Sequence, residues 1–330
     1  MTKPVHLRGY IAGPLVPFDD NLEINEREYE CQLEGMVKSN GVCGVYVNAL
    51  VGEVYALEPE ERQRLISLAR QIAPKHIPII AGITGTRMSE VEQRSREAEK
   101  AGADVLMINP PFEVRTYRRL AGKDDPPYRF FKEFTKRVNM PTMVFKYPRE
   151  YGLSYSNETL ARIAEDFDQV IGIKAGNYSS SDYYRMWNAL KGKISVFATG
   201  GDTVDLLGMM MIGADGAEAG IMCIGEEHWT RFISLSLEGS YTQARNIFME
   251  KLAPIADYIY GLAYLNPMAP FSSGGRVGST TAMIKDALVA MGVFSNSRVR
   301  PPDLDTTPEE RNGVVSLVKS LGLLEETKTV

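Results

Sequence analysis

The sequence predicts a (β/α)8 TIM barrel with a C-terminal helical extension. Short apolar runs alternate with segments of helical periodicity eight times along the chain, an alternation typical of α/β proteins. The chain has 330 residues and is 44% hydrophobic, which suits either two modest domains or one barrel with additions. No glycine-rich dinucleotide motif follows the first apolar run, which disfavours an open doubly wound sheet.

The expected strands are short runs rich in β-branched residues and bounded by turn signals. They fall at residues 9–18, 41–48, 78–83, 105–111, 141–147, 169–176, 195–199 and 216–221. Helices fit between them, because apolar residues there recur every three or four positions. The expected helices begin near residues 26, 59 and 89 and then span 128–138, 156–166, 180–191 and 202–212.

The domain organisation follows from where this alternation stops. We expect residues 1–225 to supply the barrel strands and most of its helices. Residues 226–330 should add the last barrel helix and a C-terminal helical layer, with helices near 280–291 and 308–321. The whole chain is expected to form a single structural unit. A turn-rich segment at 113–127 is long enough to be a lid or a subunit contact.

Composition and charge exclude some classes of binding partner. The net charge is −5, and acidic and basic residues are interspersed, so nothing indicates binding to nucleic acid or to an anionic membrane. A small-molecule substrate or a protein partner is favoured instead. The three cysteines and three histidines lack metal-ligand or disulfide spacing, so neither a metal site nor a disulfide framework is expected. The chain shows no secretory signal and no long apolar run, which predicts a cytoplasmic protein.

Lys174 is the residue that the apolar runs do not explain. It ends the run Val170-Ile171-Gly172-Ile173-Lys174, which reads as a buried parallel strand. Active groups of such barrels collect at the C-terminal ends of the strands. A buried ammonium loses solvation, which favours the free amine that attacks carbonyl compounds. Alternatively, Lys174 reaches to the barrel mouth or pairs with a carboxylate.

Several motifs, in consistent order from about residue 9 to 323, resemble the dihydrodipicolinate synthase / N-acetylneuraminate lyase family. They are the strand ending at Lys174, Gly52-Glu53 followed by Leu57 and Pro59-Glu60-Glu61-Arg62, the fifth strand ending at Pro148, and Val299-Arg300-Pro301-Pro302. The resemblance implies a class I aldolase or lyase. In this class a lysine forms an imine with a 2-oxo acid, commonly pyruvate, without metal or cofactor. It also implies that Lys174 is the imine lysine and that the protein is a homodimer or homotetramer.

The chain departs from the family pattern where hydroxyl groups are expected. The family loop usually reads Gly-Thr-Thr-Gly-Glu, whereas this chain has Ala49-Leu50-Val51-Gly52-Glu53. Phe145 stands where the family has a tyrosine that acts as general acid and base, and Phe112 is the best match to a second tyrosine. These replacements remove the usual proton relay, which argues against the lysine-biosynthesis reaction itself.

Other residues are candidates to replace the lost groups. Tyr147 shares the strand face of Phe145 and is our second catalytic candidate, with a rim tyrosine as the alternative. Lys146 has the opposite parity and should face the helices. Asn48 is a candidate to hydrogen-bond substrate, or else it caps its loop. We place the remaining substrate contacts, by the resemblance or by position, at Leu50, Val51, Gly52, Phe112, Phe145, Arg149 and Gly200.

Three functions remain open. The first is an imine-forming aldolase or lyase that acts on a 2-oxo acid or related carbonyl compound through Lys174. The second is a dehydratase of a 2-keto-3-deoxy sugar acid, which would use the same imine to expel water. The third is a catalytically reduced protein that binds a carbonyl metabolite. The sequence does not identify the substrate, the direction of reaction or the group that replaces the relay.

Overall fold

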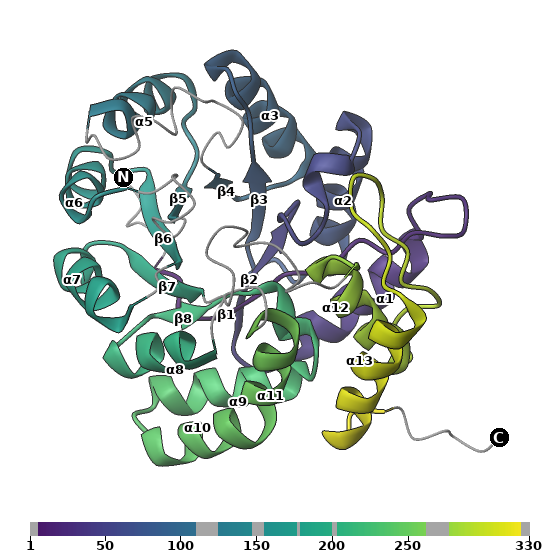
Figure 1. Cartoon of the computed structure of the whole chain (residues 1–330). Helices are drawn as coiled ribbons and strands as arrows, with labels where there is room; N and C mark the ends of the chain where they lie inside the picture. Colours follow the sequence, from purple (N-terminus) through teal and green to yellow (C-terminus); the bar gives the residue numbers. More distant parts are fainter. Residues whose placement is uncertain are drawn as a thin grey trace.

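The chain folds into a closed barrel of eight parallel strands in the order β1 to β8, as seen in a computed structural model (Figure 1). The structure describes residues 6–109, 125–146, 155–176, 179–199, 203–261 and 277–324. The strands are β1 (Gly9–Ala12), β2 (Val42–Val47), β3 (Ile79–Ile83), β4 (Val105–Ile108), β5 (Thr142–Lys146), β6 (Val170–Gly176), β7 (Ser195–Thr199) and β8 (Gly216–Ala217). The predicted fold class is confirmed.

Helices follow the strands and surround the barrel (Figure 1). Their amphipathic faces pack on the strands, and Leu33, Leu65 and Phe134 are fully buried there. These helices are α1 (Glu26–Lys38), α2 (Pro59–Ile72), α3 (Met88–Ala101), α5 (Asp125–Arg137), α6 (Asn157–Asp166), α7 (Ser180–Leu190) and α8 (Thr203–Ile212). Most begin or end within two residues of their predicted bounds.

A helical layer completes the chain, as predicted. It consists of α9 (Glu226–Leu237), α10 (Tyr241–Ile247), the π-helical turn Phe248–Leu252, α11 (Ala253–Ala256), a second π-helical turn Asp257–Gly261, α12 (Thr280–Ala290) and α13 (Pro308–Ser320). Helix α9 contacts β1 and β8, while α12 and α13 pack against each other. Within the described residues, no helix is both long and apolar enough to cross a bilayer.

Several strands are shorter than predicted, and the difference is largest for the first and the eighth. The first was expected over residues 9–18, but β1 ends at Ala12, just before Pro14, which lacks the N–H that a ladder needs. The eighth was expected over residues 216–221. Pairing ends at Ala217, although the Glu218 N–H still donates to the Ala198 carbonyl at 3.0 Å, and a 3-10 turn, Gly220–Cys223, follows. The chain therefore leaves the ladder after Glu218.

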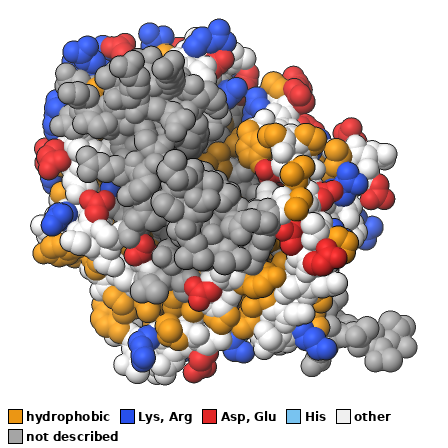
Figure 2. All heavy atoms as spheres, viewed as in Figure 1, with side chains coloured by type: hydrophobic (Ala, Val, Ile, Leu, Met, Phe, Trp, Pro, Cys, Tyr) orange, Lys and Arg blue, Asp and Glu red, His pale blue; other side chains and the backbone are white. Residues whose placement is uncertain are grey.

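The core has two parts. One lies between the sheet and the helices, and the other fills the barrel interior with side chains from alternate strand positions. In-register pairing places Phe145, Lys174 and Phe197 at one level of β5, β6 and β7. Surface charges of both signs are interspersed around the face shown in Figure 2. Lys174 is therefore a charged residue between two phenylalanines at this level of the barrel interior.

Candidate active site

Lys174 lies near the C-terminal end of β6, inside the barrel, and its side chain is only 9% exposed. Its ammonium stands 4.3 Å from the centre of the Phe145 ring and 5.2 Å from that of Tyr46. The ammonium lies over both rings, an arrangement in which the electron-rich ring face attracts a cation. Lys146, the other lysine in the described strands, points outward as predicted, and its Nζ lies 3.1 Å from Asp182 Oδ2.

A carboxylate completes the surroundings of Lys174. Glu218 forms an ion pair with the Lys174 ammonium, and its side chain is 1% exposed. The alternative in which Lys174 pairs with a carboxylate is thus the arrangement observed. Any nucleophilic role of Lys174 therefore includes the fate of its proton.

Buried polar atoms without hydrogen-bond partners gather around this pair. Among the described residues, the Tyr46 hydroxyl, both polar atoms of the Asn109 side chain and both Glu218 carboxylate oxygens lack partners of standard geometry. Burial, and secondarily the Glu218 charge, raises the pKa of Tyr46, while Asn109 opposes that shift. Unsatisfied buried polar groups are uncommon and cost free energy. Their concentration beside one lysine marks a site suited to a polar ligand.

The apolar side of the site contains three of the predicted substrate contacts. Leu50, Val51 and Phe145 belong to the same interior cluster as Tyr46. A Cβ atom at Gly220 would stand 2.6 Å from a Val51 methyl group, so that glycine makes room for Val51 beside the end of β8. Gly52 closes the tight turn that carries them, donating its N–H to the Ala49 carbonyl at 3.1 Å. The structure brings Leu50, Val51 and Phe145 together in one cluster, and their contact with substrate stays a prediction.

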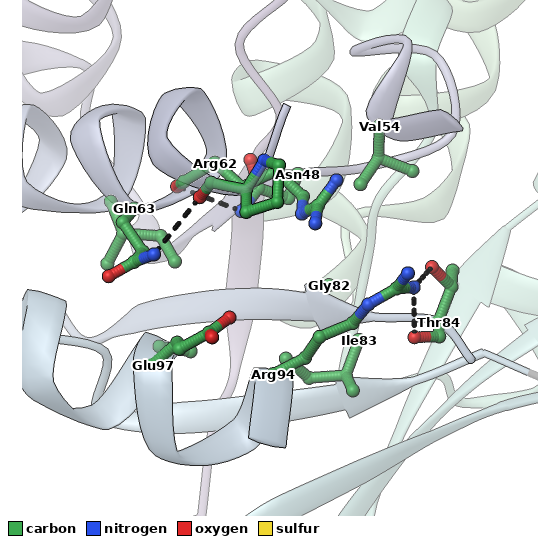
Figure 3. A pocket seen from close by; sticks show the side chains of 12 residues that line it. Asn48, Val54, Arg62, Gln63, Gly82, Ile83, Thr84, Arg94 and Glu97 are labelled. Carbon is green, nitrogen blue, oxygen red and sulfur yellow. Dashed lines mark hydrogen bonds between the residues drawn. The ribbon is translucent and has the colours of Figure 1, made fainter. Parts of the chain in front are cut away.

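Asn48 lies elsewhere. Its backbone is left-handed, with φ of 59°, and its side-chain amide donates to the Arg62 carbonyl at 3.2 Å. With Arg62, Thr84 and Arg94 it lines a cavity of about 20 Å³ between α2 and α3 (Figure 3). Neither Lys174 nor its neighbours line that cavity. Asn48 therefore caps local backbone here, and its proposed contact with substrate stays a prediction.

Two arginines, Arg62 and Arg94, line the α2–α3 cavity together with Glu97. Arg94 donates to the Thr84 carbonyl at 2.5 Å and to the Thr84 hydroxyl at 3.0 Å, as Figure 3 shows, and Arg62 donates to the Leu57 carbonyl at 2.5 Å. Burial, followed by the Arg94 charge, lowers the pKa of Arg62. Carbonyl oxygens and a hydroxyl thus hold the two guanidinium groups in place, and the small volume leaves little room for a ligand.

Four predicted site residues lie outside the described residues. They are Phe112, Tyr147, Arg149 and Gly200. Conversely, the sequence analysis did not single out Tyr46, Asn109 or Glu218. The signal for Glu218 was present, because it is a charged residue in the small-residue run Gly216-Ala217-Glu218-Ala219-Gly220. No group of three or more His, Cys, Asp or Glu side chains suited to a metal ion occurs within the described parts of the chain.

Comparisons with known proteins identify relatives of this chain. A family model described as the dihydrodipicolinate synthetase family matches residues 6–321. The 4-hydroxy-tetrahydrodipicolinate synthase of Persephonella marina is 26% identical over 318 residues, which cover 96% of this chain and 99% of that protein. The corresponding synthase of Pelobacter propionicus is 27% identical over 321 residues, with coverage of 96% and 99%.

Solved structures show the same fold. YagE, a prophage protein of this family from Escherichia coli K12 in complex with pyruvate, has a TM-score of 0.80 and 21% identity, covering 96% of this chain and 99% of its own. The dihydrodipicolinate synthase of Aquifex aeolicus has a TM-score of 0.79 and 22% identity, covering 96% and 99%. Since the family model spans almost the whole sequence, the chain belongs to the dihydrodipicolinate synthetase family.

Proposed function

We propose that the protein is a class I aldolase or lyase that forms an imine between Lys174 and a 2-oxo acid or related carbonyl compound. The observation that carries this proposal is the placement of Lys174 among buried polar atoms and two aromatic rings at the end of β6. The full-length relatives named as 4-hydroxy-tetrahydrodipicolinate synthases, and the relative solved with pyruvate, support a carbonyl substrate.

We further propose that the reaction differs from that of the named synthases. Leu50, Val51 and Phe145 occupy positions where the family pattern has hydroxyl groups, and all three pack in the apolar interior cluster. A side chain without an ionisable or hydroxyl group cannot relay protons. The residues Leu50 and Val51 also offer no hydrogen-bond donor from their side chains to a substrate carboxylate. These replacements favour a bulkier or less acidic substrate.

Imine trapping tests the first proposal. The protein is incubated with pyruvate and a panel of longer 2-oxo acids, borohydride is added, and intact mass is measured. A reduced adduct is expected in the wild type and absent in Lys174→Ala. Lys146→Ala is the matched control, because Lys146 is equally buried but faces the helices. No adduct with any compound, or an adduct that persists in Lys174→Ala, would contradict the proposal.

Product analysis tests the proposal that the reaction differs from that of the named synthases. With a 2-keto-3-deoxy sugar acid as substrate, an aldolase yields pyruvate plus an aldehyde, whereas a dehydratase expels water and yields a keto acid that keeps all the carbon atoms of the substrate. Formation of the standard synthase product from pyruvate and aspartate semialdehyde, at a rate comparable to a synthase, would contradict the proposed difference in reaction.

A further inference from the structure

We propose that Glu218 is the acid–base catalyst of imine formation at Lys174, an inference that rests on the proposed function. The proposal begins with the position of Glu218. It is the first residue after β8, and its N–H extends the ladder to Ala198, two positions beyond Gly216, the residue of β8 that is in register with Phe197 and Lys174. A Cβ atom at Gly13 would lie 3.0 Å from Glu218 Oε1, so the glycine at that position leaves the carboxylate its space.

The burial of Glu218 is not explained by a contribution to the stability of the fold. Its side chain is 1% exposed, and an isolated buried carboxylate is costly unless it is paired and fully hydrogen-bonded. Glu218 has the ion pair with Lys174, but within the described residues neither of its oxygens accepts a hydrogen bond of standard geometry. An apolar residue would fill the same space without this cost. The carboxylate is therefore best understood through its reactivity toward Lys174.

Imine formation requires such a group. The lysine must lose a proton before it attacks, and the carbonyl oxygen must gain two protons to leave as water. The family hydroxyls that would move these protons are replaced by Leu50, Val51 and Phe145. Tyr46 does not substitute as a base, because burial and the Glu218 charge raise its pKa, so that it keeps its proton. Glu218 contacts the reacting nitrogen directly.

The proton transfers balance with Glu218 as the only shuttle. The Lys174 ammonium gives a proton to the Glu218 carboxylate, and the free amine forms a bond to the carbonyl carbon while Glu218 returns that proton to the oxygen. Glu218 then takes a second proton from the nitrogen. It delivers this proton to the hydroxyl group, whose bond to carbon breaks, so water leaves as the nitrogen lone pair forms C=N. The protonated imine then faces a carboxylate, as the ammonium did before.

The test measures the rate of imine formation by borohydride quenching at successive times, with the 2-oxo acid that gives the strongest adduct. Glu218→Gln keeps an oxygen that accepts from Lys174 but cannot take up a proton. We expect imine formation about 10²–10⁴-fold slower in this variant, with the same adduct on Lys174 after long incubation. Glu218→Asp, which retains a carboxylate, should be less impaired, and added formate should accelerate Glu218→Ala.

Asp182→Asn is the matched control. It makes the same chemical change at the carboxylate that pairs with the outward-facing Lys146, and its rate should equal that of the wild type. A Glu218→Gln rate within about threefold of wild type would overturn the role of Glu218 and leave the imine at Lys174 intact. Absence of any adduct in the wild type would instead overturn the imine itself, and with it this inference.

Discussion

The Lys285 ammonium lies 2.5 Å from the Glu53 carboxylate, and neither side chain has any exposed surface. Glu53 also accepts from the Arg300 N–H at 2.8 Å, and Lys285 donates to the Arg298 carbonyl at 2.8 Å. This buried pair joins α12, in the C-terminal layer, to the turn that carries Leu50 and Val51. The helical extension therefore helps to fix the wall of the candidate site.

Removing one partner of this pair should destabilise the protein strongly. Lys285→Met leaves the Glu53 carboxylate buried without its cation, and we expect the free energy of unfolding to fall by about 3–5 kcal/mol. Urea denaturation provides the measurement. Lys38→Met, which removes a 77%-exposed lysine paired with Glu34, should change stability by less than about 0.5 kcal/mol. Equal effects of the two substitutions would contradict the role assigned to Lys285.

Glu226 predicts a pH-dependent stability. Burial raises the pKa of this carboxyl group, at the first position of α9, from 4.5 to about 7, although a hydrogen bond from Ser39 opposes the shift. Because the folded state holds the proton more tightly, the stabilising contribution is complete below pH 4.5. It is lost as the pH rises through about 7.

Glu226→Gln should remove this dependence. At pH 8 we expect the variant to be about 2 kcal/mol more stable than the wild type, a value below the full shift because the side chain is partly exposed. Near pH 4.5 the two should be equal. Denaturation at both pH values measures the difference, and Glu227→Gln, at an 81%-exposed neighbour, is the control. The same gain at both pH values would contradict the assignment to Glu226.

The apolar character of buried strands predicted both the barrel and Lys174, one of the two residues of the Lys174–Glu218 pair. A strand buried on both faces is apolar, so Lys174 is conspicuous at its end. Period-two alternation also placed Phe145 inside and Lys146 outside correctly. These inferences needed only local spacing.

The other half of the pair depended on closure of the barrel. Glu218 and Lys174 stand on strands separated by β7, and their contact depends on the register of β6, β7 and β8. Local spacing does not supply that register. The same limit applies to Tyr46 and Asn109, which read in the sequence as a buried strand residue and a loop residue. Asn48 shows the converse, since its left-handed backbone turned a predicted site residue toward α2.

The Tyr46 hydroxyl should contribute nothing to the free energy of unfolding. Its buried hydroxyl lacks a hydrogen-bond partner of standard geometry in the described parts of the chain, so Tyr46→Phe should leave stability unchanged or raise it by about 1 kcal/mol. Thermal and urea denaturation measure this. Tyr55→Phe is the comparison, because it loses a hydrogen bond to Asp303 of 2.6 Å and should cost about 0.5–1.5 kcal/mol. A larger loss in Tyr46→Phe would show that its hydroxyl is satisfied.

Tyr147 remains the predicted acid–base group for the step after imine formation. The parity of Phe145 and Lys146 is confirmed, and continuing the same alternation predicts that Tyr147 follows Phe145 toward the substrate. Tyr147→Phe should reduce turnover about 10²–10⁴-fold while imine formation proceeds at the wild-type rate. Steady-state turnover and borohydride trapping on the same preparations separate these steps. Tyr184→Phe, at a 52%-exposed tyrosine on α7, is the matched control and should retain full turnover. Unchanged turnover in Tyr147→Phe would remove this residue from the mechanism, and slowed trapping would place it in the step assigned to Glu218.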